Sequence, residues 1–284
     1  MSTPYAEVIG DPIVQSKSPA IHIFWLARLG LEARYERHLV TGDALADYFA
    51  SRRIDPAWRG CNVTMPHKHI VIAHLDRLDA LAERIGAVNT VVREGELLVG
   101  YNTDAAGFLE PLADELARTH YFRMARVLGT GGAARAIVTA LAAKRFVIVL
   151  GGRDPAKARA LLEELDPAGE HHAVDLAHFA DRTEFAFDDR AGCLDLVINA
   201  SPLGMHGQPP LAFDWSHAPP GAIAYDIVTD PVRTEFLTEA EASGHRVIDG
   251  LAMLIGQAAL AFEMFFGATP PREHDAELRS LLMA

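Results

Sequence analysis

The chain has 284 residues, of which 50% are hydrophobic and 23% charged, and its formal net charge at pH 7 is −12. This length is enough for two domains, each with its own buried core. The negative charge argues against nucleic acid and anionic membranes as partners, because both select an excess of Lys and Arg. We therefore expect a globular protein whose partners are small molecules.

Neither end of the sequence predicts a membrane or secreted protein. The first residues lack the charged and apolar blocks of a signal peptide, which favours the cytoplasm. The most apolar run, residues 251–266, contains Gln257 and Glu263 and is too short to span a bilayer. Cys61 and Cys193 are far apart in the sequence, so both are predicted to be buried thiols in a reducing compartment.

The first hundred residues alternate strand patterns with helical ones. Strands are expected at 6–9, 35–40, 60–64, 87–93 and 97–101, and helices at 20–29, 43–51 and 76–85. Ser18 is the predicted N-cap of the first helix, Pro19 its first-turn proline and Gly30 its C-terminal glycine. The pattern predicts one α/β unit.

A second α/β pattern begins near residue 125, after a predicted joining helix at 104–119. Strands are expected at 126–128, 146–150, 195–199, 222–228 and 246–248, and helices up to residue 143 and at 155–165, 251–266 and 271–282. Strands that alternate with helices predict a parallel sheet covered on both faces.

A glycine turn follows the first strand of this second unit. The residues Gly129, Thr130, Gly131, Gly132, Ala133 and Ala134 fit the G-x-G-x-x-G/A pattern of a dinucleotide site. Gly129 would make the tight turn, Gly131 would leave room for pyrophosphate, and Ala134 would allow close helix packing. Because the motif follows a strand and opens a helix, it predicts a Rossmann-like domain.

The end of the next strand bears on the choice between NAD and NADP. An NAD site places an acidic residue there, but this chain has Gly152, Arg153 and, one turn further, Lys157, which suit a 2′-phosphate. Asp154 leaves two alternatives open, because its carboxylate either repels that phosphate or caps the helix at Pro155. NADP is favoured and NAD is the less favoured alternative.

Lys68 and Asp104 follow predicted strands of the first unit and suit the reduction of a ketone. An ammonium group can stabilise the developing alkoxide and give it a proton, and a neighbouring carboxylate would orient the amine. The alternative is that the two are unrelated surface charges. His67 and His69 flank Lys68, but they lack a recognisable set of further ligands, so no metal site is predicted.

Several neutral polar side chains are candidates for substrate contacts. Ser16 and Ser18 lie two residues apart and could both donate to one carboxylate, although capping alone would explain Ser18. Thr64, Asn89 and Gln257 could bind hydroxyl groups, although each could equally serve a structural hydrogen bond.

Blocks of sequence along the whole chain resemble the shikimate dehydrogenase family. They are VIGDPI at 8–13, SKSP at 16–19, NVTMPHK at 62–68, GAVNT at 86–90, NTDAAGF at 102–108, the glycine turn, NASPLGM at 199–205 and DGLAML at 249–254 with Gln257. The resemblance implies reversible, NADPH-dependent reduction of 3-dehydroshikimate to shikimate, in chorismate and aromatic amino-acid biosynthesis. A monomer or a homodimer is expected, and the sequence does not distinguish the two.

The resemblance assigns roles to individual residues. It implies that Lys68 and Asp104 are catalytic, that Ser16 and Ser18 bind the substrate carboxylate, and that the remaining substrate contacts come from Thr64, Asn89, Asp104 and Gln257. It implies that pyrophosphate lies on residues 129–133, the 2′-phosphate on Arg153 and Lys157, and the nicotinamide near Ile227 and Gly250. The implied domains are a substrate-binding domain at 1–104, an NADP-binding Rossmann-like domain at 105–249, and C-terminal helices at 250–284 that complete the first domain.

The chain departs from the family pattern at three places. Gly152 and Asp154 stand where Asn and Thr are usual, and Gln15 replaces a His before the first serine. Thr229 replaces a tyrosine of the substrate pocket, which leaves a gap or room for a bulkier substrate. These differences keep two alternatives open: an NAD-dependent quinate/shikimate dehydrogenase, and a nucleotide-binding regulator without catalytic activity.

Overall fold

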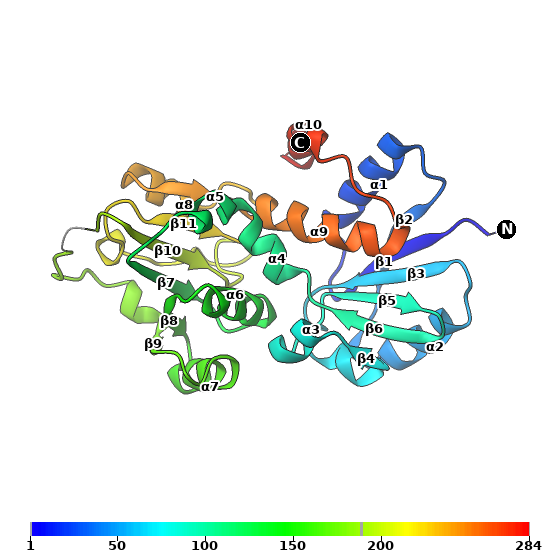
Figure 1. The fold of residues 1–284 in the computed structure, drawn as a ribbon, viewed down its shortest axis with the longest axis horizontal. Helices are drawn as coiled ribbons and strands as arrows, with labels where there is room; N and C mark the ends of the chain where they lie inside the picture. Colours follow the sequence, from blue (N-terminus) through cyan, green and yellow to red (C-terminus); the bar gives the residue numbers. More distant parts are fainter. Residues whose placement is uncertain (1, 188–189, 284) are drawn as a thin grey trace. The chain divides into compact units, whose positions relative to one another are not determined.

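The computed structural model describes residues 2–187 and 190–283, which form two compact units. Unit 1 comprises residues 1–104 and 255–284, and unit 2 comprises residues 105–254. Each unit contains a six-stranded sheet with helices on its faces (Figure 1). The predicted α/β class with a Rossmann-like second part is confirmed.

The sheet of unit 1 is mixed, in the order β2-β1-β3-β5-β6-β4. Its strands are β1 (Tyr5–Gly10), β2 (Arg34–Leu39), β3 (Trp58–Val63), β4 (Arg77–Leu78), β5 (Thr90–Glu94) and β6 (Leu97–Tyr101). β1 pairs with β2 and β3 in parallel, whereas β5 runs antiparallel to both β3 and β6. The end of β3, the start of β5 and the end of β6 therefore lie at one edge of the sheet.

Two groups of helices cover the two faces of this sheet. The helices of unit 1 are α1 (Ser18–Leu29), η1 (Gly42–Ala44), α2 (Leu45–Arg53), η2 (Ile70–His74), α3 (Ala80–Ile85), most of α9 (Gly250–Phe266), η6 (Arg272–His274) and α10 (Asp275–Met283). Side chains of α2, η2 and α3 share one core cluster with β1, β3 and β5. On the other face, His22 and Trp25 of α1 pack on Phe262 of α9.

Gly60 of β3 shows why α9 lies so close to the sheet. A Cβ atom at this position would come within 2.6 Å of the Phe265 ring and 2.3 Å of the Val91 carbonyl oxygen. Only a residue without a side chain permits this approach.

The sheet of unit 2 is entirely parallel, in the order β12-β11-β10-β7-β8-β9. Its strands are β7 (Phe122–Leu128), β8 (Val147–Gly152), β9 (His172–Asp175), β10 (Cys193–Asn199), β11 (Ile223–Asp226) and β12 (Arg246–Ile248). When these strands are counted from β7 as 1 to β12 as 6, the sheet order starting at β9 is 3-2-1-4-5-6. This order is typical of dinucleotide-binding sheets. The strand order reverses between β7 and β10, and ligands of such sheets bind at that point.

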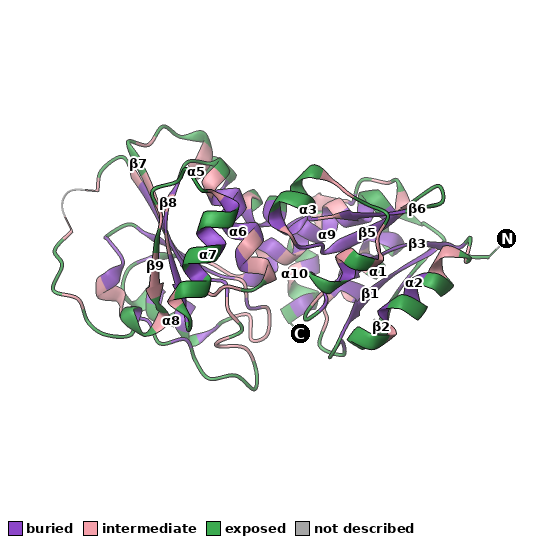
Figure 2. Ribbon diagram, turned by 90° about the horizontal axis from the view of Figure 1, so that it is seen from below, coloured by how far each residue is buried: buried purple, intermediate pink, exposed green. Residues whose placement is uncertain are grey.

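Helices flank the second sheet as well. They are α4 (Asp104–Leu109), η3 (Glu110–Leu112), α5 (Ala113–Ala117), α6 (Gly132–Ala143), α7 (Pro155–Leu165), η4 (Leu176–Phe179), η5 (Trp215–His217) and α8 (Glu235–Ala242). Phe236 and Leu237 of α8 join a core cluster with β10, β11 and η4 on one face of the sheet. Figure 2 shows the central strands of both sheets mostly buried, whereas the edge strands β2 and β9 are exposed or half-buried along most of their length. The outward sides of helices such as α2 and α7 are exposed.

Three predictions about local structure are wrong. The predicted helix at 104–119 is interrupted by the 3-10 turn Glu110–Leu112, because Pro111 lacks the amide hydrogen that a continuous helix needs. The predicted helix at 76–85 begins only at Ala80, because Asp79 caps it with bonds to the amides of Ala82 (2.8 Å) and Leu81 (3.2 Å). The predicted strand at 87–93 begins at Thr90.

The prediction that Ser18 is an N-cap is also wrong. Lys17 already has near-helical backbone angles (φ −86°, ψ −8°), so α1 begins at Ser18 itself and no side chain caps it. Pro19 lies in the first turn and Gly30 ends the helix in the left-handed conformation (φ 62°), as predicted.

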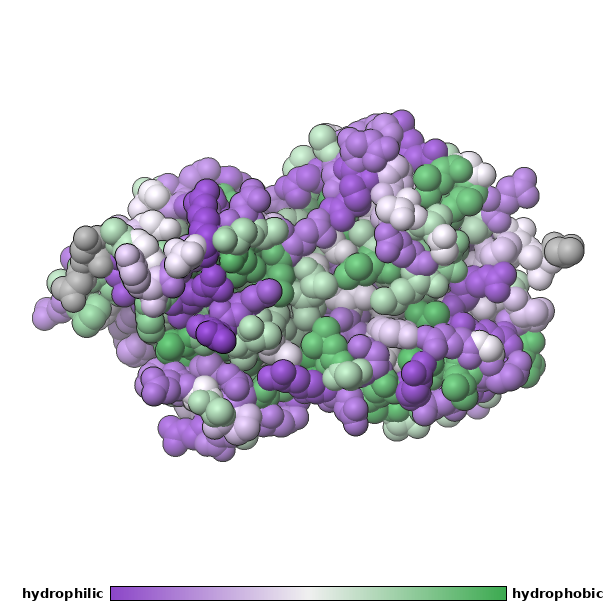
Figure 3. Space-filling model, in the orientation of Figure 1, coloured by the Kyte–Doolittle hydropathy of each residue, from purple (hydrophilic) through white to green (hydrophobic). Residues whose placement is uncertain are grey.

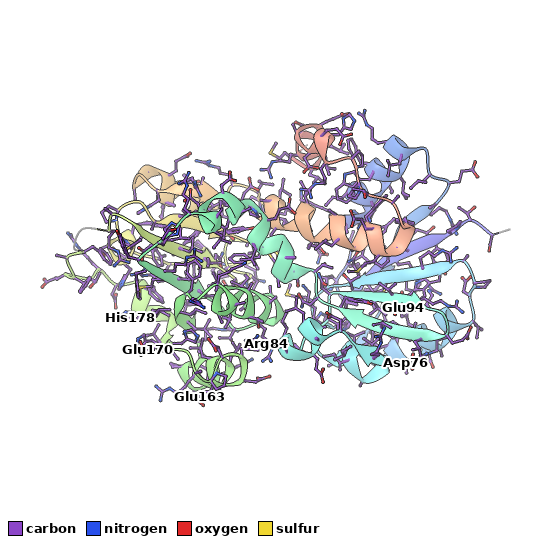
Figure 4. All side chains as sticks on the ribbon, in the orientation of Figure 1. Asp76, Arg84, Glu94, Glu163, Glu170 and His178 are labelled. Atoms are coloured by element: carbon purple, nitrogen blue, oxygen red, sulfur yellow. The ribbon has the colours of Figure 1, made fainter. Side chains whose placement is uncertain are left out.

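The surface carries charged side chains in ion pairs. Figure 4 labels Asp76 and Glu94 in unit 1, which pair with Arg53 at 2.7 Å and Arg77 at 2.6 Å. Polar residues dominate the visible face of the molecule, with small hydrophobic groups among them (Figure 3). Within the described residues, every helix is too short or too polar to be a membrane span.

Cys61 is buried as predicted, but Cys193, the first residue of β10, is only half-buried.

Candidate active site

Lys68 and Asp104 form an ion pair at one edge of the sheet of unit 1. The Lys68 Nζ atom lies 2.5 Å from Asp104 Oδ2, and their side chains are 16% and 7% exposed. Lys68 follows β3 and Asp104 follows β6, two strands that end at the same edge. A shielded pair of this kind holds the Lys68 amine in a fixed orientation. The two residues are therefore not unrelated surface charges.

Asn89 and Gln257 lie beside this pair. The Asn89 Nδ2 atom donates to Asp104 Oδ1 (2.9 Å), to Thr103 Oγ1 (2.8 Å) and, more weakly, to Gln257 Oε1 (3.3 Å). Asn89 precedes β5, which runs antiparallel to β3, so it lies at the edge where Lys68 and Asp104 also lie. The structure thus brings four of the predicted site residues together from three strands and a helix.

Ser16, Ser18 and Thr64 lie after the parallel neighbours β1 and β3. The Ser16 Oγ atom accepts a long bond from the Ser18 amide (3.4 Å), and the Ser16 carbonyl accepts bonds from Arg37. Thr64 is half-buried, and its amide bonds to the Ile9 carbonyl of β1 at 3.0 Å. The Ser18 side chain is buried in the first turn of α1, so capping does not account for it.

The histidines around Lys68 bond to the backbone. A ring nitrogen of His67 lies 2.6 Å from the Val40 carbonyl oxygen, and one of His69 lies 2.7 Å from that of Gly86. Across residues 2–187 and 190–283, no group of three or more His, Cys, Asp or Glu side chains is arranged to hold a metal ion. These histidines stabilise the loop that carries Lys68.

The glycine turn of unit 2 lies where the strand order reverses. Gly129 has a φ of 125°, and a Cβ atom there would lie 2.7 Å from the Ala200 carbonyl oxygen, just after β10. Gly131 is the N-cap of α6, and a Cβ atom there would meet nothing within 4 Å. Ala134 is fully buried. The turn therefore presents open backbone amides at a helix N-terminus, which suits a phosphate.

Asp154 is the N-cap of α7. Its Oδ1 atom accepts bonds from the amides of Ala156 (3.0 Å) and Lys157 (3.2 Å), so the capping alternative is the one that the structure shows. The side chains of Arg153 and Lys157 are exposed and, among the described residues, have no ion-pair partner. Gly152 lies against Thr130, with a Cβ atom there 2.9 Å from the Thr130 methyl group.

Ile227, Thr229 and Gly250 lie close to the end of β11. A Cβ atom at Gly250 would come within 2.2 Å of the Val228 carbonyl oxygen, so the start of α9 touches this loop. The Ile227 amide bonds to the Asn199 carbonyl at 3.1 Å, and Thr229 is half-buried. This loop is therefore joined to the carboxyl end of β10.

Asp226, which the sequence patterns did not single out, organises this loop. It is fully buried, and its carboxylate accepts bonds from Asn199 Nδ2 (3.0 Å), the Val228 amide (2.9 Å) and Thr234 Oγ1 (2.7 Å). Burial raises its pKa to about 6 despite these three bonds, which act in the opposite direction. In the sequence, the position of Asp226 at the end of an apolar strand was the feature that could have identified it as a buried carboxylate.

Comparison with known proteins agrees with this geometry. Residues 8–91 match the shikimate dehydrogenase substrate binding domain, and residues 250–277 match the shikimate 5′-dehydrogenase C-terminal domain. The chain is 51% identical to the shikimate dehydrogenase (NADP(+)) of Sphingopyxis alaskensis, over 100% of this chain and 98% of that protein. It is 42% identical to the protein of the same name from Bacillus licheniformis, over 95% of this chain and 94% of that protein.

Solved structures show the same similarity. Shikimate 5-dehydrogenase of Thermus thermophilus, in complex with NADP(H) and shikimate, is 36% identical with a TM-score of 0.79, over 99% of this chain and 100% of that one. The ligand-free 5-ketofructose reductase of a Gluconobacter strain is 28% identical with a TM-score of 0.82, over 99% of each chain. With full-length relatives at these identities, this chain belongs to the shikimate dehydrogenase family.

Proposed function

We propose that this protein is an oxidoreductase that catalyses the reversible, NADPH-dependent reduction of 3-dehydroshikimate to shikimate. The observation that carries the proposal is the shielded pair of Lys68 Nζ and Asp104 Oδ2, 2.5 Å apart, in a chain that belongs to this family. The nucleotide-type turn at Gly129 supports it independently.

The chain's own residues would handle the proton. NADPH, when bound, supplies a hydride to the carbonyl carbon of the substrate. Lys68 would donate a proton to the carbonyl oxygen as it becomes an alkoxide, and Asp104 would keep the amine oriented throughout. The resulting amine would regain a proton from solvent, so the reduction consumes one hydride and one proton. In the reverse direction Lys68 would accept the hydroxyl proton.

Unit 1 would bind the substrate. Hydroxyl groups of Ser16 and Ser18 are suited to the substrate carboxylate, because both can donate hydrogen bonds to an anion. Thr64, Asn89 and Gln257 would bind the ring hydroxyls. The convergence of β1, β3, β5 and β6 on one edge supports these assignments.

Unit 2 would bind the cofactor. Residues 129–133 would hold the pyrophosphate at the N-terminus of α6. The Gly129 amide itself bonds to the Gly151 carbonyl at 2.8 Å, so the donors to the pyrophosphate would be the amides that follow it. Arg153 and Lys157 are free to bind a 2′-phosphate, and the Asp154 carboxylate is engaged by two amides, which favours NADP over NAD. The backbone near Ile227 and Gly250 would contact the nicotinamide.

Replacement of the catalytic lysine tests the proposal. Lys68→Ala should lower kcat by about 10²- to 10⁴-fold and change KM much less, because the interaction forms mainly as the alkoxide develops. The rate is followed as NADPH consumption, and the exposed Lys144→Ala is the matched control. A Lys68→Ala enzyme with a kcat close to that of the wild type would show that the assignment is wrong.

Thr229 favours one second candidate, an NAD-dependent quinate/shikimate dehydrogenase. A threonine is much shorter than the tyrosine usual at this position and would admit a bulkier substrate. Initial rates with shikimate and quinate, each with NADP and NAD, separate the two. A dominant quinate rate with NAD would replace the first proposal, and NADPH binding without any turnover would indicate a regulator. A cytoplasmic location and a monomer or homodimer stay predictions.

A further inference from the structure

The orientation of the Asn89 side chain is fixed by its neighbours in unit 1. Its Oδ1 atom accepts bonds from the Thr103 amide (2.8 Å) and from Thr90 Oγ1 (3.1 Å). Only Nδ2 is then left to face Asp104 Oδ1, at 2.9 Å. An inverted amide would place an oxygen against the carboxylate, so this orientation decides whether Asp104 is stabilised or repelled.

A line of buried side chains, Tyr35 on β2, Asn62 on β3 and Thr90 on β5, leads to Asn89. Tyr35 donates its hydroxyl proton to Asn62 Oδ1 at 2.5 Å. Asn62 Nδ2 donates in turn to Thr90 Oγ1 (3.1 Å), which leaves the Thr90 hydroxyl proton to point at Asn89 Oδ1. Every donor in the line is therefore directed toward Asp104.

Tyr35 is well suited to begin this line. Its ring is 3% exposed and stacks on His22, with ring centroids 3.9 Å apart and an interplanar angle of 2°. Burial raises the pKa of the Tyr35 hydroxyl well above its ordinary value, so the group stays protonated and remains a donor. Burial also lowers the pKa of His22 to about 3, so its ring packs as a neutral surface.

We propose that Tyr35, Asn62 and Thr90 are positioning residues for the catalytic pair, acting through Asn89 on Asp104. This inference rests on the proposed function of the pair. The three side chains are between 0% and 5% exposed, so they act through neighbours and leave substrate contact to others. Breaking the line at any point should allow the Asn89 amide to rotate and the Asp104 carboxylate to drift from Lys68.

Two substitutions remove one hydroxyl each from the line. Tyr35→Phe and Thr90→Val should each lower kcat by about 3- to 10-fold. KM should rise as well, because a rotated Asn89 amide no longer presents the same group to the substrate hydroxyl. Thr90→Ser keeps the hydroxyl and should restore kcat. Because the residues act in one line, the double variant should be little slower than the slower single variant, rather than showing the product of both losses.

A second buried tyrosine in unit 1 is the matched control. Tyr48 donates its hydroxyl to Glu7 Oε2 at 2.8 Å and is 6% exposed, but it has no hydrogen bond to the line described above. Tyr48→Phe should lower the midpoint of thermal unfolding as Tyr35→Phe does and leave kcat within about two-fold of the wild type. Equal kcat values for Tyr35→Phe and the wild type, or multiplying losses in the double variant, would overturn the proposal.

A measurement without substrate separates this proposal from the proposed function. In the ligand-free protein, NMR reports hydrogen exchange of the side-chain amide of Asn89. Tyr35→Phe should accelerate this exchange by at least about three-fold, and Tyr48→Phe should leave it unchanged. If the wild type fails to reduce 3-dehydroshikimate, the proposed function fails, and the exchange rates still decide whether the line holds Asn89.

Discussion

The buried carboxylate of Asp226 predicts an unusual dependence of stability on pH. Its pKa rises from 3.8 to about 6 in the folded protein because burial disfavours the charged form. The folded state therefore binds more protons than the unfolded state between these two values. It follows that the contribution of Asp226 to stability falls as the pH rises through this window, opposite to that of an ordinary paired aspartate.

The size of the effect follows from the shift. A difference of about two pKa units corresponds to roughly 3 kcal/mol of unfolding free energy between pH 4 and pH 7. Asp226→Asn keeps an oxygen for Asn199 and Val228 and a polar group for Thr234, but it has no charge to bury. The variant should gain stability relative to the wild type over this range.

Urea unfolding at several pH values between 4 and 7 measures the gain. Asp214→Asn is the control, because the half-buried Asp214, bonded to Ser216, has a carboxyl pKa lowered from its ordinary value. The difference in unfolding free energy between Asp214→Asn and the wild type should stay constant between pH 4 and pH 7. A carboxyl titration of Asp226 by NMR with a midpoint near 4, or a pH-independent difference for Asp226→Asn, would refute the reasoning.

The cofactor site gives three further predictions. The double variant Arg153→Gln/Lys157→Gln should raise KM for NADPH at least about ten-fold and leave KM for NADH nearly unchanged. The control Arg159→Gln, two residues further along α7, should alter neither KM. Steady-state kinetics with both cofactors measure these effects. Asp154→Ala should lower the unfolding free energy by about 1 kcal/mol through loss of the cap, and Asp154→Ser should restore it, as chemical denaturation would show. Gly129→Ala should abolish NADPH binding in a calorimetric titration, because its Cβ would lie 2.7 Å from a carbonyl oxygen at a φ of 125°.

Local sequence determined much of the architecture of this protein. Alternation of strand and helix patterns predicted two α/β units, and the glycine turn after a strand predicted a dinucleotide-type fold. Proline and glycine placed the first turn and the end of α1 correctly. These features depend on backbone preferences of a few adjacent residues, which a sequence displays directly.

Tertiary structure decided the features that depend on distant residues. The ion pair of Lys68 with Asp104 exists because β3 and β6 end at one edge of a mixed sheet, and strand order cannot be read from local patterns. The roles of Tyr35, Asn62 and Asp226 likewise come from partners far along the chain or from burial in a sheet. Hydrogen-bond partners and burial are set by how elements pack, so they emerge only in the folded chain.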